Sequence, residues 1–156
     1  MHTVAGMLEM VVYHDRPTGS THIALVRGTP AGDREVLVRV HEPLSVLDLL
    51  EIDREGHSWP LHRALNAIAT SECGVMVMLN CGESGDRLLE GIVPGERAGA
   101  DAPERRGGER QNLRTYGVGA QILRDLGVAR MKLLAKPRKM PSMAGFGLII
   151  TGYLES

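Results

Sequence analysis

A short basic stretch near the carboxyl end of the chain has the residue types needed to bind an anion. It contains Arg130, Lys132, Lys136, Arg138 and Lys139. A basic turn at the end of a strand can hold a phosphate through charge-assisted hydrogen bonds. Because runs of charge are usually solvated faces of a protein, an ordinary basic surface is the competing interpretation.

Other common catalytic and nucleotide-binding patterns are absent from the sequence. Gly117-Val118-Gly119 is not followed by the spacing of a dinucleotide-binding loop, and no strand leads directly into it. The sequence has neither a P-loop nor the G-x-S-x-G turn of a hydrolase nucleophile. The 8 Met residues mostly lie in predicted strands or near the Pro141 turn, and adaptable core packing is expected of them rather than a redox or metal function.

The elements that must position these residues begin with strands. Apolar runs and alternation predict strands at residues 7–14, 21–27 and 35–41. Short turns rich in Gly, Pro and Asp connect them. An antiparallel meander is therefore expected at the amino-terminal end.

A helix and a buried strand are predicted next. Ser58 is a candidate N-cap, and Pro60 falls in the first turn of a helix that spans residues 59–71. The unbroken apolar run 75–79 is typical of a strand that is buried on both faces. A helix that leads into such a strand implies that helices pack against the sheet.

The second half of the chain contains a polar segment between two ordered regions. Residues 94–112 include no Val, Ile, Leu, Met or aromatic side chain. Such a segment buries too little apolar surface to offset its ordering entropy, so a mobile loop is predicted.

A helix is predicted at 115–126 with Gly127 as its cap, followed by strands at 130–134 and 147–154.

Length and composition indicate one globular domain. The 156 residues are predicted to form a single α/β domain, 1–156, with a mixed β-sheet and helices packed on it. The 18 basic and 19 acidic side chains give a net charge of -1, which argues against nucleic acid or an anionic membrane as a partner. With 2 cysteines and no visible signal peptide, a cytoplasmic protein is expected.

Several segments, taken in order, resemble the GTP cyclohydrolase II family, which opens riboflavin biosynthesis. Residues 21–28 are similar to the family's "hhALVkG" strand, and residues 36–41 to "pVLvRVHse". Residues 113–128 read LRTYGVGAQILRDLGV, where the family has "LRdYGiGAQILrdLGv". Residues 132–139 are similar to a shortened "rLLTNNPrK". The resemblance covers about residues 4–154 and implies a GTP cyclohydrolase II-like fold.

The resemblance also implies positions for a nucleotide. Arg39 and His41 match residues near the family's nucleotide, and Arg138 and Lys139 match a phosphate-facing turn. GTP or a phosphate anion is therefore the expected class of ligand. From the sequence alone, Arg39 could equally pair with an acidic neighbour such as Glu35.

The family resemblance further implies a zinc ion on three cysteines, and this chain has other residues at those positions. An alignment without gaps places Leu44, Glu55 and His57 there. Leucine has no lone pair to donate, and a zinc site needs about four ligands. Glu55 and His57 could join a replacement site, although ordinary solvated loop residues are the simpler interpretation. No metal cofactor is therefore expected.

Further positions also lack residues that the family uses to contact the nucleotide or to catalyse the reaction. Gly82 and Ser84 replace the Glu and Arg of a loop that contacts the nucleotide. The family's catalytic Asp-Leu-Arg reads Asn112-Leu113-Arg114 here, so Arg114 is retained as a catalytic candidate while the carboxylate becomes an amide. An amide cannot act as a general base near neutral pH. Tyr116, the tyrosine nearest the family's catalytic one, is expected to be structural.

The first hypothesis is a catalytically degenerate GTP cyclohydrolase II domain, and not an active enzyme. The resemblance implies a homodimer, and in many bacteria such a domain forms the carboxy-terminal half of a bifunctional protein. The other half is 3,4-dihydroxy-2-butanone 4-phosphate synthase (DHBP synthase). We expect this domain to stabilise or regulate that synthase, either fused to it or associated with it.

Two alternatives remain open at this point. One is an active cyclohydrolase whose rebuilt metal site uses Glu55 and His57 together with His41, Cys73 or Cys81. The other is a sensing module that binds GTP or a flavin without converting it.

Overall fold

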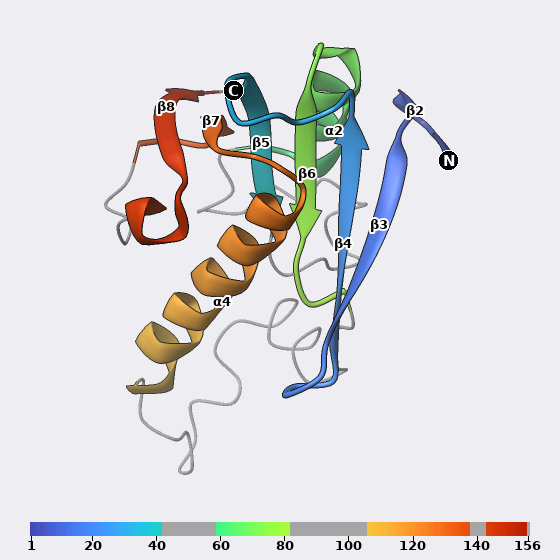
Figure 1. Ribbon diagram of the computed structural model, residues 1–156. Coiled ribbons are helices and arrows are strands. Elements are labelled where there is room, and N and C mark those ends of the chain that lie inside the picture. Colours follow the sequence, from blue (N-terminus) through green and yellow to red (C-terminus); the bar gives the residue numbers. More distant parts are fainter. Residues whose placement is uncertain (42–58, 82–105, 138–142, 156) are drawn as a thin grey trace.

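The computed structural model describes residues 1–41, 59–81, 106–137 and 143–155, and Figure 1 shows their path. A small hairpin is formed by β1 (His2–Thr3) and β2 (Gly6–Met7). The main sheet has the order β3-β4-β6-β5-β7-β8. Its strands are β3 (Glu9–Asp15), β4 (Ser20–Arg27), β5 (Glu35–His41), β6 (Gly74–Met78), β7 (Arg130–Leu134) and β8 (Ile149–Leu154). Helices α2 (Leu61–Thr70) and α4 (Arg106–Asp125) and the short 3-10 helix η1 (Met143–Phe146) complete the described elements.

Strand β6 lies inside the sheet because both of its faces are apolar. Val75, Met76 and Val77 have exposed fractions of 0%. The strand pairs antiparallel with β4 and parallel with β5. The prediction of a strand buried on both faces is confirmed, and so is the predicted α/β class with a mixed sheet.

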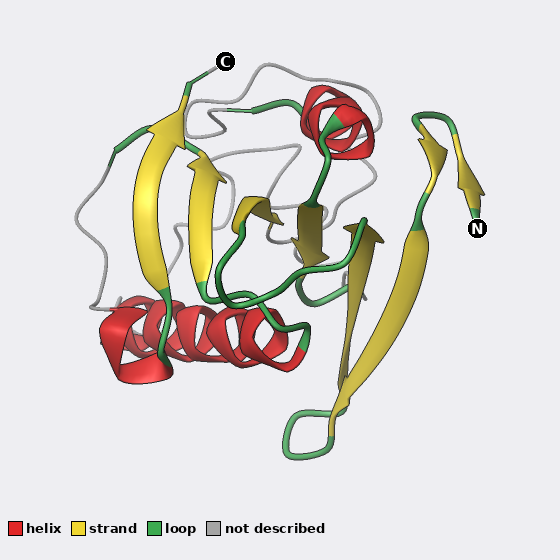
Figure 2. Cartoon of the chain, turned by 45° about the horizontal axis from the view of Figure 1, so that its top comes forward, coloured by secondary structure: helices red, strands yellow, loops and turns green. Residues whose placement is uncertain are grey.

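The two helices cover opposite faces of the sheet, as Figure 2 shows. The chain passes from β5 through α2 to β6 on one side of β5, and then through α4 to β7 on the other side. Crossovers between parallel strands are almost always right-handed. Two crossovers that run in opposite directions along the sheet therefore place their helices on opposite faces. Each helix buries one core cluster: Ile68 of α2 packs with Leu25 and Met76, and Ile122 of α4 packs with Val38 and Val77.

The predicted meander is correct for its first two strands. β3 and β4 pair antiparallel from Glu9 opposite Val26 to Asp15 opposite Ser20. The third strand, β5, is separated from β4 by β6. A strand that is apolar on both faces is best buried with a neighbour on each edge, which explains why β6 takes that place.

Helix α4 begins earlier than its apolar stripe predicts. Residues 106–112 are helical, so the loop predicted over 94–112 is wrong for them, and residues 94–105 lie outside the described residues. Glu109, Arg110 and Gln111 have high helix propensity, which lets a helix continue beyond its packed part. At the other end, Gly127 has φ 85° and caps the helix as predicted.

Helix α2 agrees with its prediction apart from its first turn. It spans Leu61–Thr70, and Pro60 directly precedes it in an extended conformation, with φ -59° and ψ 144°. The predicted cap Ser58 lies outside the described residues. Among the described helices, none combines the length and the hydrophobicity needed to span a membrane.

Gly28 is a position where the turn after β4 requires glycine. Its φ is 71°, and an added Cβ would collide with the carbonyl oxygen of Glu72. We expect Gly28→Ala to lower the free energy of unfolding by about 1–3 kcal/mol, because alanine is strained at this φ and the colliding atom belongs to the backbone. Gly19→Ala is the matched control, since Gly19 has φ 68° but nothing within 4 Å of an added Cβ. Urea denaturation measures both, and equal losses would contradict a role for the collision.

Candidate functional site

Two of the predicted site residues, Arg39 and His41, lie on β5 at one edge of the sheet. β5, β6 and β7 run parallel, so their carboxyl ends meet at this edge, with His41 opposite Met78. The antiparallel hairpin brings the end of β3 and the start of β4 to the same edge, because Ile23 lies opposite Met78 and Asp15 opposite Ser20. Ligands of open α/β sheets bind at the carboxyl ends of strands where the chain reverses its direction of travel.

Arg39 and His41 point to the α2 face of this edge. Alternate residues of a strand share a face, and Leu37 of the same strand packs in the core cluster under α2. Both side chains are buried, with exposed fractions of 8% for Arg39 and 1% for His41. The structure therefore brings these two predicted nucleotide-binding residues together, within the protein interior.

The guanidinium of Arg39 binds backbone carbonyls of two other segments. Its Nη1 donates to the carbonyl oxygen of Leu134 at 2.9 Å, and its Nη2 to that of Trp59 at 3.5 Å. The indole of Trp59 in turn donates to the carbonyl oxygen of Leu154 at 2.8 Å. Arg39 and Trp59 thus join the carboxyl ends of β5, β7 and β8 to the segment that leads into α2.

Arg114 lies on α4, on the opposite face of the sheet from Arg39. Its Nη2 lies 3.2 Å from the Oδ2 of Asp15 at the end of β3, and the two side chains are 53% and 17% exposed. This ion pair links α4 to the β3–β4 hairpin. The retained family arginine is therefore engaged by a carboxylate of this chain.

Local interactions stabilise the charged form of Asp15. The hydrogen bond from the Thr18 hydroxyl is the main reason that the pKa of its carboxyl lies below the ordinary 3.8. Arg114 lowers the pKa further through its charge and its hydrogen bond, while partial desolvation acts in the opposite direction. Asp15 is consequently ionised and able to hold Arg114 at neutral pH.

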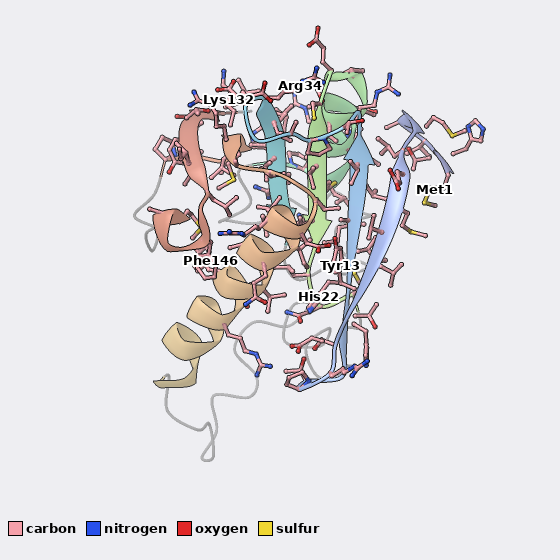
Figure 3. The ribbon with its side chains drawn as sticks, viewed as in Figure 1. Met1, Tyr13, His22, Arg34, Lys132 and Phe146 are labelled. Carbon is pink, nitrogen blue, oxygen red and sulfur yellow. The ribbon has the colours of Figure 1, made fainter. Side chains whose placement is uncertain are left out.

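An open cavity of about 560 Å³ separates this hairpin from α4. It is lined by Tyr13, His14, Asp15, Arg16, Pro17, His22, Val118, Gln121, Ile122 and Asp125. The Tyr13 hydroxyl donates to the Oδ2 of Asp125 at 2.8 Å, across the cavity wall. Burial of the phenol and, secondly, this carboxylate raise the pKa of Tyr13, so it stays protonated. Figure 3 shows Tyr13 and His22 close to each other between the hairpin and α4.

His22, on β4, is buried at the same edge of the sheet. It is 3% exposed, and its Nδ1 accepts the backbone N–H of Asn80 at 2.9 Å. Asn80 follows β6 and has φ 51°, a left-handed conformation that asparagine tolerates better than most residues. The bond fixes the direction in which the chain leaves β6.

The two cysteines do not form a pair of metal ligands. Cys73 directly precedes β6 and is buried in the core, whereas Cys81 follows the other end of that strand. A five-residue strand separates them, which excludes a shared ion. Burial raises the pKa of both thiols, and the Cys81 thiol donates to the carbonyl oxygen of Met78 at 3.4 Å. Neither is a ready thiolate ligand.

Several predicted positions lie outside the described residues: Leu44, Glu55, His57, Gly82, Ser84, Arg138 and Lys139. Within the described ranges, no group of three or more His, Cys, Asp or Glu side chains could hold a metal ion. The predictions made for these seven positions therefore stay predictions.

Sequence reasoning missed the residues that line the cavity. Asp15 falls in the turn predicted after the first strand and Asp125 in the helix predicted at 115–126, and the sequence gives neither of them a role. Their partners lie far along the chain, with Arg114 at a separation of 99 residues from Asp15 and Tyr13 at 112 from Asp125. The one available signal was the position of His22 inside the motif at residues 21–28.

Comparisons with known proteins place the chain among proteins of riboflavin biosynthesis. Residues 1–155 match the family described as GTP cyclohydrolase II. The chain is 40% identical to the DHBP synthase of Neisseria meningitidis serogroup B over all of its length, and 36% identical to that of Pseudomonas aeruginosa over 97% of its length. It is also 38% identical to the riboflavin biosynthesis protein RibBA of Bacillus subtilis over 94% of its length.

A solved structure shows the same fold. The structure described as RibBX, a two-domain DHBP synthase from A. baumannii, matches 99% of this chain with a TM-score of 0.58 and 27% identity. This chain corresponds to 37% of that protein and to 40%, 40% and 38% of the three relatives above. It thus spans about two fifths of the length of the curated relatives. The resemblance inferred from the sequence is confirmed.

The contacts of Arg39 predict a structural contribution. Arg39→Met removes the donors to Leu134 and Trp59 but keeps an unbranched side chain. We expect it to lower the free energy of unfolding by about 2–3 kcal/mol, because buried carbonyls lose their partner. Lys132→Met, on the neighbouring strand β7, is the control and is expected to cost less. Unchanged stability together with weaker GTP binding would instead assign Arg39 to a ligand.

The Asp15 carboxylate predicts a pH dependence. Its folded-state pKa is lowered, so its contribution to stability is present above the unfolded pKa and disappears as the pH falls through 3.8 and below. Wild-type protein is therefore expected to be more stable than Asp15→Asn at pH 7, and the difference is expected to shrink below pH 4. Thermal unfolding between pH 3 and pH 7 tests this. The difference is expected to be smaller in an Arg114→Met background, and a gap that does not vary with pH would contradict the assignment.

Proposed function

Because this chain belongs to the GTP cyclohydrolase II family, we propose that it is a catalytically inactive member that supports DHBP synthase in riboflavin biosynthesis. The observation that carries the proposal is the set of residues at the zinc positions that the family resemblance implies. Leu44 has no donor atom, and Glu55 and His57 replace two thiolates.

This set of donors does not fit the implied zinc ion. Zinc sites are built from thiolate, imidazole and carboxylate ligands in a closed geometry, and a leucine removes one of them outright. Cys73 cannot compensate, because it is buried at the far end of β6 from this edge. No catalytic step is therefore assigned to a metal in this chain.

The remaining catalytic groups support the same proposal. Asn112 replaces the carboxylate that the resemblance implies as a base, and an amide does not accept a proton near neutral pH. Arg114 is retained, but its guanidinium pairs with Asp15. A cationic group that is held by a carboxylate of its own chain is less available to a substrate phosphate.

The names of the relatives support a role alongside the synthase. The Neisseria and Pseudomonas relatives are described as DHBP synthases, and the matching solved structure as a two-domain DHBP synthase. The region that matches this chain makes up about two fifths of each. A domain that keeps its core packing but not its chemistry is suited to stabilise or regulate a partner.

Further expectations belong to this proposal. A homodimer is expected from the family resemblance, and a cytoplasmic location from the free thiols Cys73 and Cys81. Residual binding of GTP or phosphate is expected from Arg138 and Lys139, whose charge is retained.

The proposal is tested by mixing the purified chain with the DHBP synthase of the same organism. We expect the chain to raise the melting temperature or the turnover of the synthase with ribulose 5-phosphate. The chain alone is expected to contain less than stoichiometric zinc and to release no formate from GTP. A variant with Leu44→Cys, Glu55→Cys and His57→Cys provides a positive control for the zinc measurement.

Each other outcome points to a different function. Stoichiometric zinc together with formate release would show an active enzyme with a rebuilt site. A thermal shift with GTP or a flavin, without turnover, would favour a sensing module, and saturation at 100 times the dissociation constant adds about 2.7 kcal/mol. Unchanged synthase kinetics and melting temperature would contradict the supporting role.

A further inference from the structure

The face of the sheet that carries α2 is not covered by this helix over β3. Helix α2 packs against β4, β5 and β6, where Leu25 and Met76 form part of its core cluster. Met10 and Val12 extend the same apolar face onto β3, because they lie opposite Leu25 and Ile23 in the antiparallel pairing. Yet Met10 is 44% exposed and Val12 is 57% exposed.

The amino-terminal hairpin, which directly precedes β3, also carries exposed apolar side chains. Met1, Val4 and Met7 are exposed by 54%, 95% and 55%. Two hydrogen bonds between Met1 and Leu8 close the open end of the hairpin: the amino-terminal ammonium donates to the carbonyl oxygen of Leu8 at 2.6 Å, and the Leu8 N–H donates to that of Met1 at 3.0 Å. Leu8 itself is buried. We call Met1, Val4, Met7, Met10 and Val12 the amino-terminal apolar surface.

A strand edge accompanies this surface. β3 is the terminal strand of the described sheet, so one of its edges pairs with no described strand. Figure 1 shows β3 at this margin, with β2 and the amino terminus beside its first residues. Exposed apolar side chains and an unpaired strand edge are both features of protein interaction sites.

We propose that the amino-terminal apolar surface is where a DHBP synthase domain packs, an inference that rests on the proposed function. In the two-domain synthase that matches 99% of this chain, the matching region is accompanied by another domain that makes up most of the protein. Covering the sheet over β3 would also complete the layer that α2 begins.

A second copy of this chain fits the strand edge less well. If the β3 strands of two copies pair antiparallel along their whole length, Val12 of one copy lies opposite Val12 of the other. Glu9 of each copy then lies opposite Asp15 of the other. Two carboxylates directly opposite each other destabilise a strand pair. The ionised state of Asp15, which Thr18 and Arg114 favour, increases this cost.

The test measures binding of the purified chain to the DHBP synthase of the same organism by isothermal titration calorimetry. We expect the Met10→Glu/Val12→Glu variant to bind at least tenfold more weakly than wild type, because it places charges in an apolar contact. Ile149→Glu on β8 is the matched control, since Ile149 is 55% exposed at the opposite edge of the sheet. It is expected to bind like wild type. If the double substitution prevents folding, Val12→Thr is a milder variant, because threonine also favours the strand conformation.

The possible failures can be told apart. If wild-type chain does not bind the synthase, the proposed function fails. If wild type, the double variant and Ile149→Glu all bind equally, the supporting role stands and the proposed surface is wrong. If the double variant loses self-association in size-exclusion chromatography but keeps its affinity for the synthase, the surface binds a second copy and the proposal is overturned.

Discussion

The burial of β6 on both faces is the constraint on which the rest of the structure depends. A strand with no polar face needs a layer of side chains above and below it, and the two crossovers supply these layers as α2 and α4. The carboxyl ends of β5, β6 and β7 lie at the same edge because these strands are parallel. The two crossovers run in opposite directions along the sheet, so this edge is also where the strand order reverses its direction. This packing brings the elements that carry the site residues to the same edge of the sheet.

The strands were largely predictable because their signals are local. The apolar run at β6 and the alternation in β5 indicate burial without any knowledge of neighbours. The order of the strands is not local, which is why β5 was expected beside β4. The extent of α4 was underestimated for a similar reason: polar residues with high helix propensity carry no periodic signal.

The candidate site was predictable only in part. Family resemblance identified Arg39, His41 and Arg114, but it did not indicate their contacts. Arg39 proved to be bonded to backbone carbonyls, and Arg114 to a carboxylate of the hairpin. Such pairings depend on how distant segments approach each other, and one sequence holds little information about that.

The contact between Arg39 and Trp59 has an evolutionary consequence. β5 ends at His41 and the next described residue is Trp59, so this contact closes the base of the segment in between from within the folded core. The entropic cost of closing a loop between two such fixed residues changes slowly with loop length. Leu44, Glu55 and His57 all belong to this segment. Under the proposed function, the bond between Arg39 and Trp59 would let residues of this segment change while the surrounding domain kept its fold.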